Sequence, residues 1–164
     1  MTDDQTKGVY AISIVRIIFG WMFLWAFFDK MFGLGFETPA GSGFIDGGSP
    51  SSFAVYVTDG LFKDFYLSIA GNGFIDILMM LGIIALGVSL TFGIASKLGT
   101  IGSVAFFLIM FSMHIPPTDN PLVDYHILYA FAIVAVYYLG GFRKLSLHDK
   151  WKSLKIVKRF PILE

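Results

Sequence analysis

The chain has no cysteine and little charge. None of its 164 residues is Cys, and only 15% are Asp, Glu, Lys or Arg. The absence of cysteine excludes a thiolate nucleophile, a dithiol relay and a cysteine-ligated iron–sulfur cluster on this chain. Any redox chemistry that it performs therefore has to use a bound molecule. The sequence also has no internal repeat, phosphate-binding glycine loop or nucleic-acid-binding motif, so we expect no nucleic-acid partner.

What the chain has instead is long apolar segments. Hydrophobic residues make up 55% of it and aromatic residues 17%, which is too apolar for an ordinary soluble domain. About 20 apolar residues are needed to cross a bilayer core about 30 Å thick. We therefore predict an all-α integral membrane protein, a four-helix transmembrane bundle with a single domain over residues 1–164. Its helices are expected at about residues 9–33, 74–96, 98–115 and 122–142.

The few charged residues are sorted by side when the segments between these helices are assigned to alternate sides. Ten of the twelve Lys and Arg residues share a side with both termini: Lys7, Arg16, Lys97, Arg143, Lys144, Lys150, Lys152, Lys155, Lys158 and Arg159. Eight of the twelve acids lie on the other side: Asp29, Glu37, Asp46, Asp59, Asp64, Asp76, Asp119 and Asp124. Because Lys and Arg in short loops stay in the cytoplasm, we predict a multi-pass protein of a prokaryotic cell membrane with both termini cytoplasmic. No small-residue cleavage site follows the first apolar segment, so we expect that helix to be retained.

Two amphipathic segments are expected outside the bundle. In the first outer loop, Ser49 is a candidate N-cap and Pro50 suits the first helical position. Apolar residues then recur at i+4 spacing, which predicts a helix over about 50–70 on the outer surface. Such a helix fits equally well as a lid over a site or as a seal on the bundle. The tail, 143–164, combines apolar residues on one face with lysines, which predicts an interfacial helix attracted to anionic lipid.

Ionisable residues inside or against apolar segments are candidate functional residues, because burying a charge in a bilayer is costly. Six of them fall at the outer ends of the four helices and predict a polar mouth there: Asp29, Lys30, Asp76, His114, Asp124 and His126. Arg16 lies deeper, near the cytoplasmic end of the first helix. It fits either a side chain that reaches inner-leaflet phosphates or one that faces a ligand or a buried acid.

The helical period indicates which side chains face inward. Arg16 and Lys30 fall on one stripe of the first helix together with phenylalanines that suit a flat apolar ligand, whereas Asp29 falls on the far side. His126 shares a face with Ile133 on the last helix, and Asp124 points elsewhere. Two histidines at one end of a bundle also fit haem ligation or, with a carboxylate, a metal site. The pattern offers a single histidine pair, however, so we expect neither haem nor metal.

Three segments are similar to a known family: RIIFGWMFLWAFFDKMFGLGFETP from Arg16, the FIDGGSP loop, and NPLVDYHILYAFAI from Asn120. They resemble the DoxX/DoxD-like membrane proteins, and more closely the DoxD-type subunit of thiosulfate:quinone oxidoreductase. The resemblance covers nearly the whole chain, including the four-helix topology and the long first outer loop. It implies oxidation of thiosulfate to tetrathionate with quinone as the electron acceptor, in the lipid bilayer and with a separate DoxA-type partner subunit. Whether the chain also forms a homo-oligomer stays open.

The resemblance and the polar mouth together select the expected site residues. We expect His126 to handle protons, Lys30 to orient the anion, and Asp76 to take part in catalysis. The substrate and the quinone are expected to contact Arg16, Asp29, Asp124 and His114. An alternative is a non-catalytic accessory subunit of a larger membrane complex. A carrier or channel is a third interpretation, although the chain has neither a broken-helix pair nor an inverted repeat.

Overall fold

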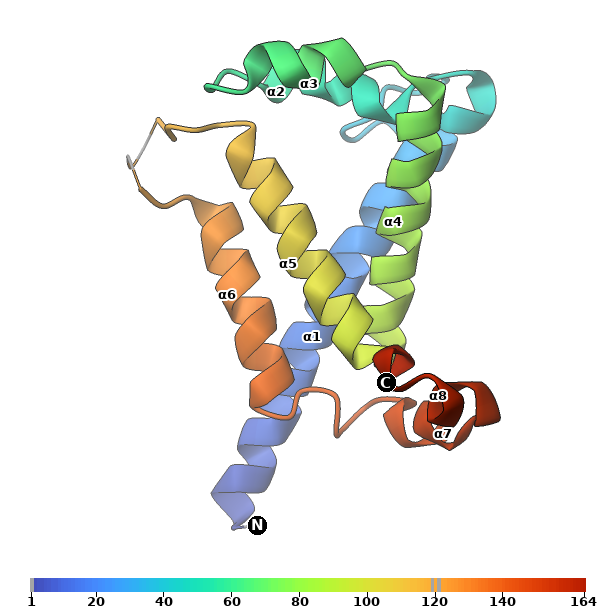
Figure 1. Ribbon diagram of the computed structural model, residues 1–164, viewed down its shortest axis with the longest axis vertical. Coiled ribbons are helices and arrows are strands. Elements are labelled where there is room, and N and C mark those ends of the chain that lie inside the picture. The colour runs from blue at the N-terminus through green and yellow to red at the C-terminus, as the bar shows by residue number, and fades with distance from the viewer. Residues whose placement is uncertain (1, 119, 121) are drawn as a thin grey trace.

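The computed structural model describes residues 2–118, 120 and 122–164 (Figure 1). Within these residues the chain is helical and forms no strand, which confirms the predicted all-α class. Asp119, counted above among the outer acids, and Pro121 lie outside the described residues, as does Met1. The four apolar segments form the four longest helices: α1 (Asp3–Phe32), α4 (Gly73–Phe92), α5 (Ser96–Ser112) and α6 (Tyr125–Tyr138).

The long helices pack mainly in two pairs, α1 with α4 and α5 with α6. In the first pair the backbones approach closely. A Cβ on Gly20 would overlap Thr91, and one on Gly87 would lie 2.8–2.9 Å from atoms of Leu24. Small residues allow such contacts between apolar helices. Figure 1 shows α4 and α5 close together at the end near the C-terminus and diverging toward residues 50–69, which we call the outer segment. The bundle therefore widens in that direction.

The outer segment differs from the single helix predicted over 50–70. It forms a 3₁₀ turn (Pro50–Phe53), α2 (Ala54–Val57) and, after a break, α3 (Lys63–Ile69); another 3₁₀ turn (Phe44–Asp46) precedes them. At the break, the backbone N–H groups of Asp59 and Gly60 donate to the carbonyl of Met113. Leu61 N–H donates to the carbonyl of Ile115 at 2.7 Å. These bonds satisfy carbonyls just beyond the end of α5, and they replace the intrahelical bonds that a continuous helix would need.

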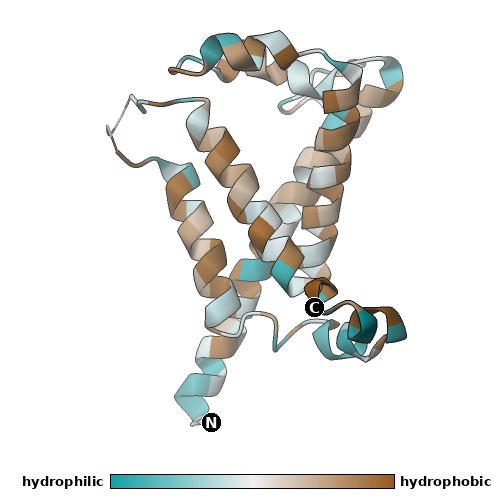
Figure 2. Cartoon of the chain, in the orientation of Figure 1, coloured by the Kyte–Doolittle hydropathy of each residue, from teal (hydrophilic) through white to brown (hydrophobic). Residues whose placement is uncertain are grey.

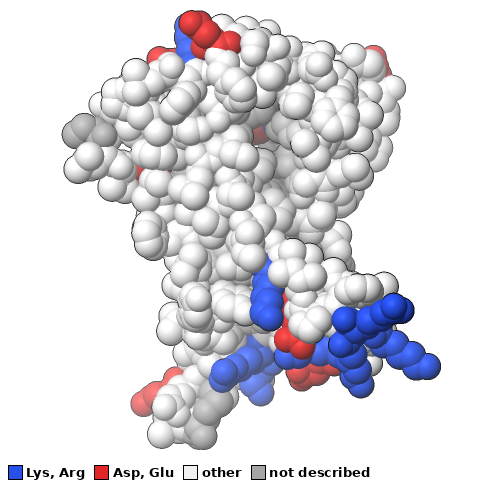
Figure 3. All heavy atoms as spheres, viewed as in Figure 1, with Lys and Arg blue, Asp and Glu red and all other residues white. Residues whose placement is uncertain are grey.

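The tail also differs from the predicted single helix. It contains α7 (His148–Ser153), α8 (Lys155–Arg159) and a 3₁₀ turn (Pro161–Leu163), and extended backbone at Leu154 separates the two helices. The tail folds back on the start of α5, because Lys97 N–H donates to the carbonyl of Glu164 at 2.8 Å. Figure 3 shows Lys and Arg gathered at this end of the molecule, where the tail and the N-terminus lie.

In the part of the chain that the structure describes, two helices, α1 and α4, are long and apolar enough to cross a membrane; α5 and α6 are apolar but shorter. Many large apolar side chains on the long helices are exposed, among them Ile18, Trp21, Leu81, Ile101, Leu128 and Phe131. Figure 2 shows hydrophobic residues along all four long helices, and Figure 3 shows a middle zone almost free of Lys, Arg, Asp and Glu on this face. An exposed apolar surface of this extent is unusual for a soluble monomer and is typical of contact with lipid or a partner.

Candidate functional site

A cavity of about 600 Å³ lies between the four long helices, where the bundle widens beneath the outer segment. Phenylalanine and methionine side chains form much of its wall: Phe23, Phe53, Phe106, Phe107, Met79 and Met110. Polar side chains also line it: Lys30, Glu37, His114, Tyr125, His126 and Tyr129. Pockets of this size, mostly apolar with a few polar groups, are typical of small-molecule sites.

His126 lies in the first turn of α6 and is held by the residue that begins the helix. The Asp124 carboxylate is the N-cap and accepts the backbone N–H groups of His126 and Ile127 at 2.9 and 3.1 Å. Its second oxygen lies 2.6 Å from His126 Nδ1. Because a carboxylate accepts, Nδ1 carries the hydrogen and Nε2 is the nitrogen that remains for a ligand. Asp124 therefore points back to His126, which corrects the expectation that it faces elsewhere.

His114 forms a second pair of the same kind beside the first. Its Nδ1 lies 3.2 Å from a carboxylate oxygen of Asp59, in the break between α2 and α3. The two imidazole rings are nearly parallel, with an interplanar angle of 10° and centroids 6.0 Å apart. The side chains of Asp124 and His126 are 11% and 10% exposed, whereas those of Asp59 and His114 are 61% and 30% exposed. The two pairs thus extend from the buried cavity toward the outer surface.

Lys30 reaches the cavity from the last turn of α1. Its side chain is 8% exposed, and its Nζ lies 2.9 Å from the Glu37 carboxylate, which the loop after α1 supplies. The ammonium group also lies over the ring of Phe53, 5.5 Å from its centroid. The positive charge of Lys30 is therefore balanced by a carboxylate and an aromatic face.

Asp29 and Asp76 are buried beside the site but do not line the cavity. The Asp29 carboxylate accepts the backbone N–H groups of Phe36, Glu37 and Thr38 at 2.8–3.2 Å. The loop after α1 thus folds over Asp29 and buries it outside the cavity. Asp76 accepts from Ser49 Oγ at 2.8 Å and from Ser51 N–H at 2.7 Å. Asp29 therefore holds the loop after α1 on the bundle, and Asp76 holds the start of the outer segment.

Arg16 lies at the opposite end of the bundle and is fully buried. Its guanidinium donates to the backbone carbonyls of Gly141, Lys144 and Leu145, at 2.8, 3.3 and 2.5 Å. It also lies over the ring of Phe142, 5.4 Å from the centroid. These partners belong to the turn after α6, so Arg16 joins α1 to the end of α6 and does not reach the outer cavity.

The structure therefore brings together three of the seven predicted site residues in the cavity wall, namely Lys30, His114 and His126, with Asp124 directly behind His126. Sequence reasoning assigned no site role to Glu37, Asp59, Tyr125 or Tyr129. Tyr129 follows from the helical spacing, because it lies about one turn after His126, whereas Tyr125 directly precedes His126. Glu37 and Asp59 lie in loops, and their contacts depend on how those loops fold back.

Comparison of the chain with known protein families, with curated protein sequences and with solved structures finds no match. Within residues 2–118, 120 and 122–164, the structure groups no three His, Asp or Glu side chains in a way that suits a metal ion.

Proposed function

We propose that this chain is a four-helix transmembrane protein of the prokaryotic cell membrane that binds a quinone in its outer cavity. Its termini lie in the cytoplasm, and it serves as a membrane subunit of a quinone-linked oxidoreductase. The exposed apolar side chains on α1, α4, α5 and α6 support four membrane crossings. With 17 and 14 residues, α5 and α6 are about 26 and 21 Å long, so local thinning of the bilayer would accompany them.

The observation that carries the proposal is the combination of chemistries in one cavity. Phenylalanine and methionine walls suit a flat apolar ring, and the histidines, tyrosines and lysine offer hydrogen-bond donors to ring oxygens. His126 is the main candidate for proton transfer, because Asp124 fixes its orientation and leaves Nε2 for the ligand. The Asp59–His114 pair lies between this residue and the outer surface, where it can exchange protons with water.

The resemblance to the DoxD-type subunit supplies the proposed reaction. Two thiosulfate ions lose one electron each and join through a new S–S bond as tetrathionate, and a bound quinone accepts both electrons and two protons. The thiosulfate dianion needs positive charge, yet Lys30 is paired with Glu37 and the outer side carries eight acids. We therefore place thiosulfate oxidation on a DoxA-type partner subunit and quinone binding on this chain.

A non-catalytic accessory subunit is the second candidate. It is favoured by the apolar surface of the outer segment, where Tyr56 is 88% exposed, Leu61 77% and Phe65 59%. A partner that covered this surface would account for it without any chemistry in the cavity below. The two candidates differ in whether the cavity binds a quinone.

Binding of a short-tailed quinone to the purified protein, measured by calorimetry in detergent, separates them. Replacing His126 with Leu should weaken binding about tenfold, because one hydrogen bond to the ligand is lost. His126→Gln, which keeps a donor, should bind more tightly than the Leu variant. The matched control is His148→Leu at the opposite end of the molecule, which should leave affinity unchanged. Absence of binding to the wild-type chain, or an equal loss in both Leu variants, would favour the accessory subunit.

A further inference from the structure

A second cavity, of about 670 Å³, lies between α4 and α5 beneath α3. Small residues on the two facing helices line its middle: Gly82, Ala85, Gly102 and Ala105. Larger apolar side chains line the rest, including Leu78, Leu86 and Ile109. We call this cavity the α4–α5 groove.

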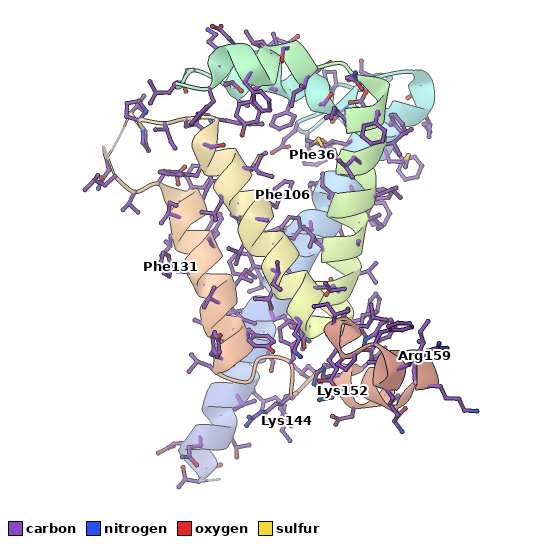
Figure 4. All side chains as sticks on the ribbon, in the orientation of Figure 1. Phe36, Phe106, Phe131, Lys144, Lys152 and Arg159 are labelled. Carbon is purple, nitrogen blue, oxygen red and sulfur yellow. The ribbon has the colours of Figure 1, made fainter. Side chains whose placement is uncertain are left out.

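The groove and the outer cavity share part of their walls. Five side chains line both: Phe53, Met79, Phe106, Met110 and Met113. Figure 4 shows Phe106 on the side of α5 that faces α1 and α4, whereas Phe131 points away from the bundle. Three of the five shared residues are methionines, whose unbranched side chains change rotamer readily. The partition between the two cavities is therefore built from movable side chains.

The outer segment covers the outer end of the groove. The long side of the groove lies between the exposed apolar side chains of α4 and α5. Tyr66 of α3 is buried, packs with Ala54 and Met113, and hydrogen-bonds the hydroxyl of Ser112 at 2.5 Å. At the flanks, Leu78 is 58% exposed and Ile109 48%. A Cβ built on Gly82 meets no atom within 4 Å, so the groove is open at that point. It thus opens sideways, at the level of the exposed apolar side chains.

We propose that the α4–α5 groove holds the isoprenoid tail of a membrane quinone and is the route by which the quinone reaches the outer cavity from the bilayer. This inference rests on the proposed function, because it places the quinone ring in the outer cavity. The two adjoining spaces match a molecule with a polar ring and a long apolar tail: donors line the outer cavity, and apolar side chains dominate the groove. The ligand is then a long-tailed quinone taken from the membrane, with no need to pass through water.

Gly82 offers a direct test, because a Cβ at this position meets no atom within 4 Å and a larger side chain therefore starts in the open space of the groove. Phe and Leu also have higher helix propensity than Gly, so Gly82→Phe and Gly82→Leu should keep α4 folded. The matched control is Leu81→Phe, which adds bulk at a neighbouring position that is 62% exposed and does not line the groove. All three variants are compared with the full wild-type chain in lipid nanodiscs.

Equilibrium affinity is measured for two ligands with the same ring, one with eight isoprenoid units and one without a tail. We expect Gly82→Phe to weaken binding of the long-tailed quinone at least about tenfold, with a smaller loss for Gly82→Leu. Binding of the tail-less quinone should stay within about twofold, and Leu81→Phe should change neither affinity.

Unchanged affinity of the Gly82 variants for the long-tailed quinone would overturn the inference, as would equal losses for both ligands. So would displacement of a bound phospholipid, with no change in quinone binding. In each of these cases the tail-less quinone still binds the wild-type chain, so quinone binding in the outer cavity stands. If the tail-less quinone does not bind the wild-type chain at all, the proposed function fails as well.

Discussion

Replacing Arg16 with glutamine should lower the free energy of unfolding by about 3–5 kcal/mol, the largest stability effect that we expect from a single substitution. The guanidinium is fully buried and donates to three backbone carbonyls in the turn after α6. Glutamine is shorter and has one amide group, so most of these buried carbonyls would lose their donor. Thermal unfolding in detergent, followed by circular dichroism, should show a midpoint lower by at least about 6 °C.

The matched control for Arg16 is Arg143→Gln, which removes the same charge from an exposed position at the same end of the molecule. That variant should change the free energy of unfolding by no more than about 0.5 kcal/mol. Arg16→Lys should fall between the two, because a single ammonium group cannot span three carbonyls as a planar guanidinium does. Equal stability of the Arg16→Gln and Arg143→Gln variants would contradict the structural role that we assign to Arg16.

Replacing Asp124 with asparagine should lower thiosulfate-dependent quinone reduction by about 10²-fold or more, in membranes that contain the whole enzyme. Asparagine is as good an N-cap as aspartate, so α6 and the bundle should stay folded. What changes is the partner of His126 Nδ1, because a carboxylate 2.6 Å away becomes a neutral amide. The ring then loses its fixed tautomer and the charge that stabilises its protonated form.

Asp59→Asn is the matched control for Asp124→Asn, because Asp59 pairs with His114 in the same way but is 61% exposed. Water can replace that carboxylate, so the loss of activity should be much smaller. If both variants keep full activity, His126 does not handle protons and the accessory subunit is favoured.

Much of the bundle could be predicted from the sequence, because the apolar segments, and the residues that begin and end each helix, are local signals. Gly33 and Gly93 end α1 and α4 in the left-handed conformation, and Asn72 and Asp124 cap α4 and α6. The helical period also placed Arg16 and Lys30 on the buried stripe of α1, where both are found.

The features that were missed depend on contacts between distant segments. The break after α2 forms because residues 59–61 donate to carbonyls beyond α5, and no local pattern predicts that contact. Asp29 is buried for a similar reason, since the loop that follows α1 folds back over it. Arg16 was expected to meet phosphates, a ligand or an acid, whereas it binds backbone carbonyls, which leave no sequence signature.

The central claim is that the outer cavity holds a quinone, and the most direct measurement is to identify the small molecules that the protein carries. The chain is purified gently from its membrane, and the bound molecules are extracted and identified by mass spectrometry. An optical spectrum is recorded on the same sample. We predict long-tailed quinone in a stoichiometric amount, reduced to a trace in a Gly82→Phe variant prepared in parallel. Lipid alone, together with a second polypeptide in constant ratio, would contradict the claim and identify the chain as an accessory subunit.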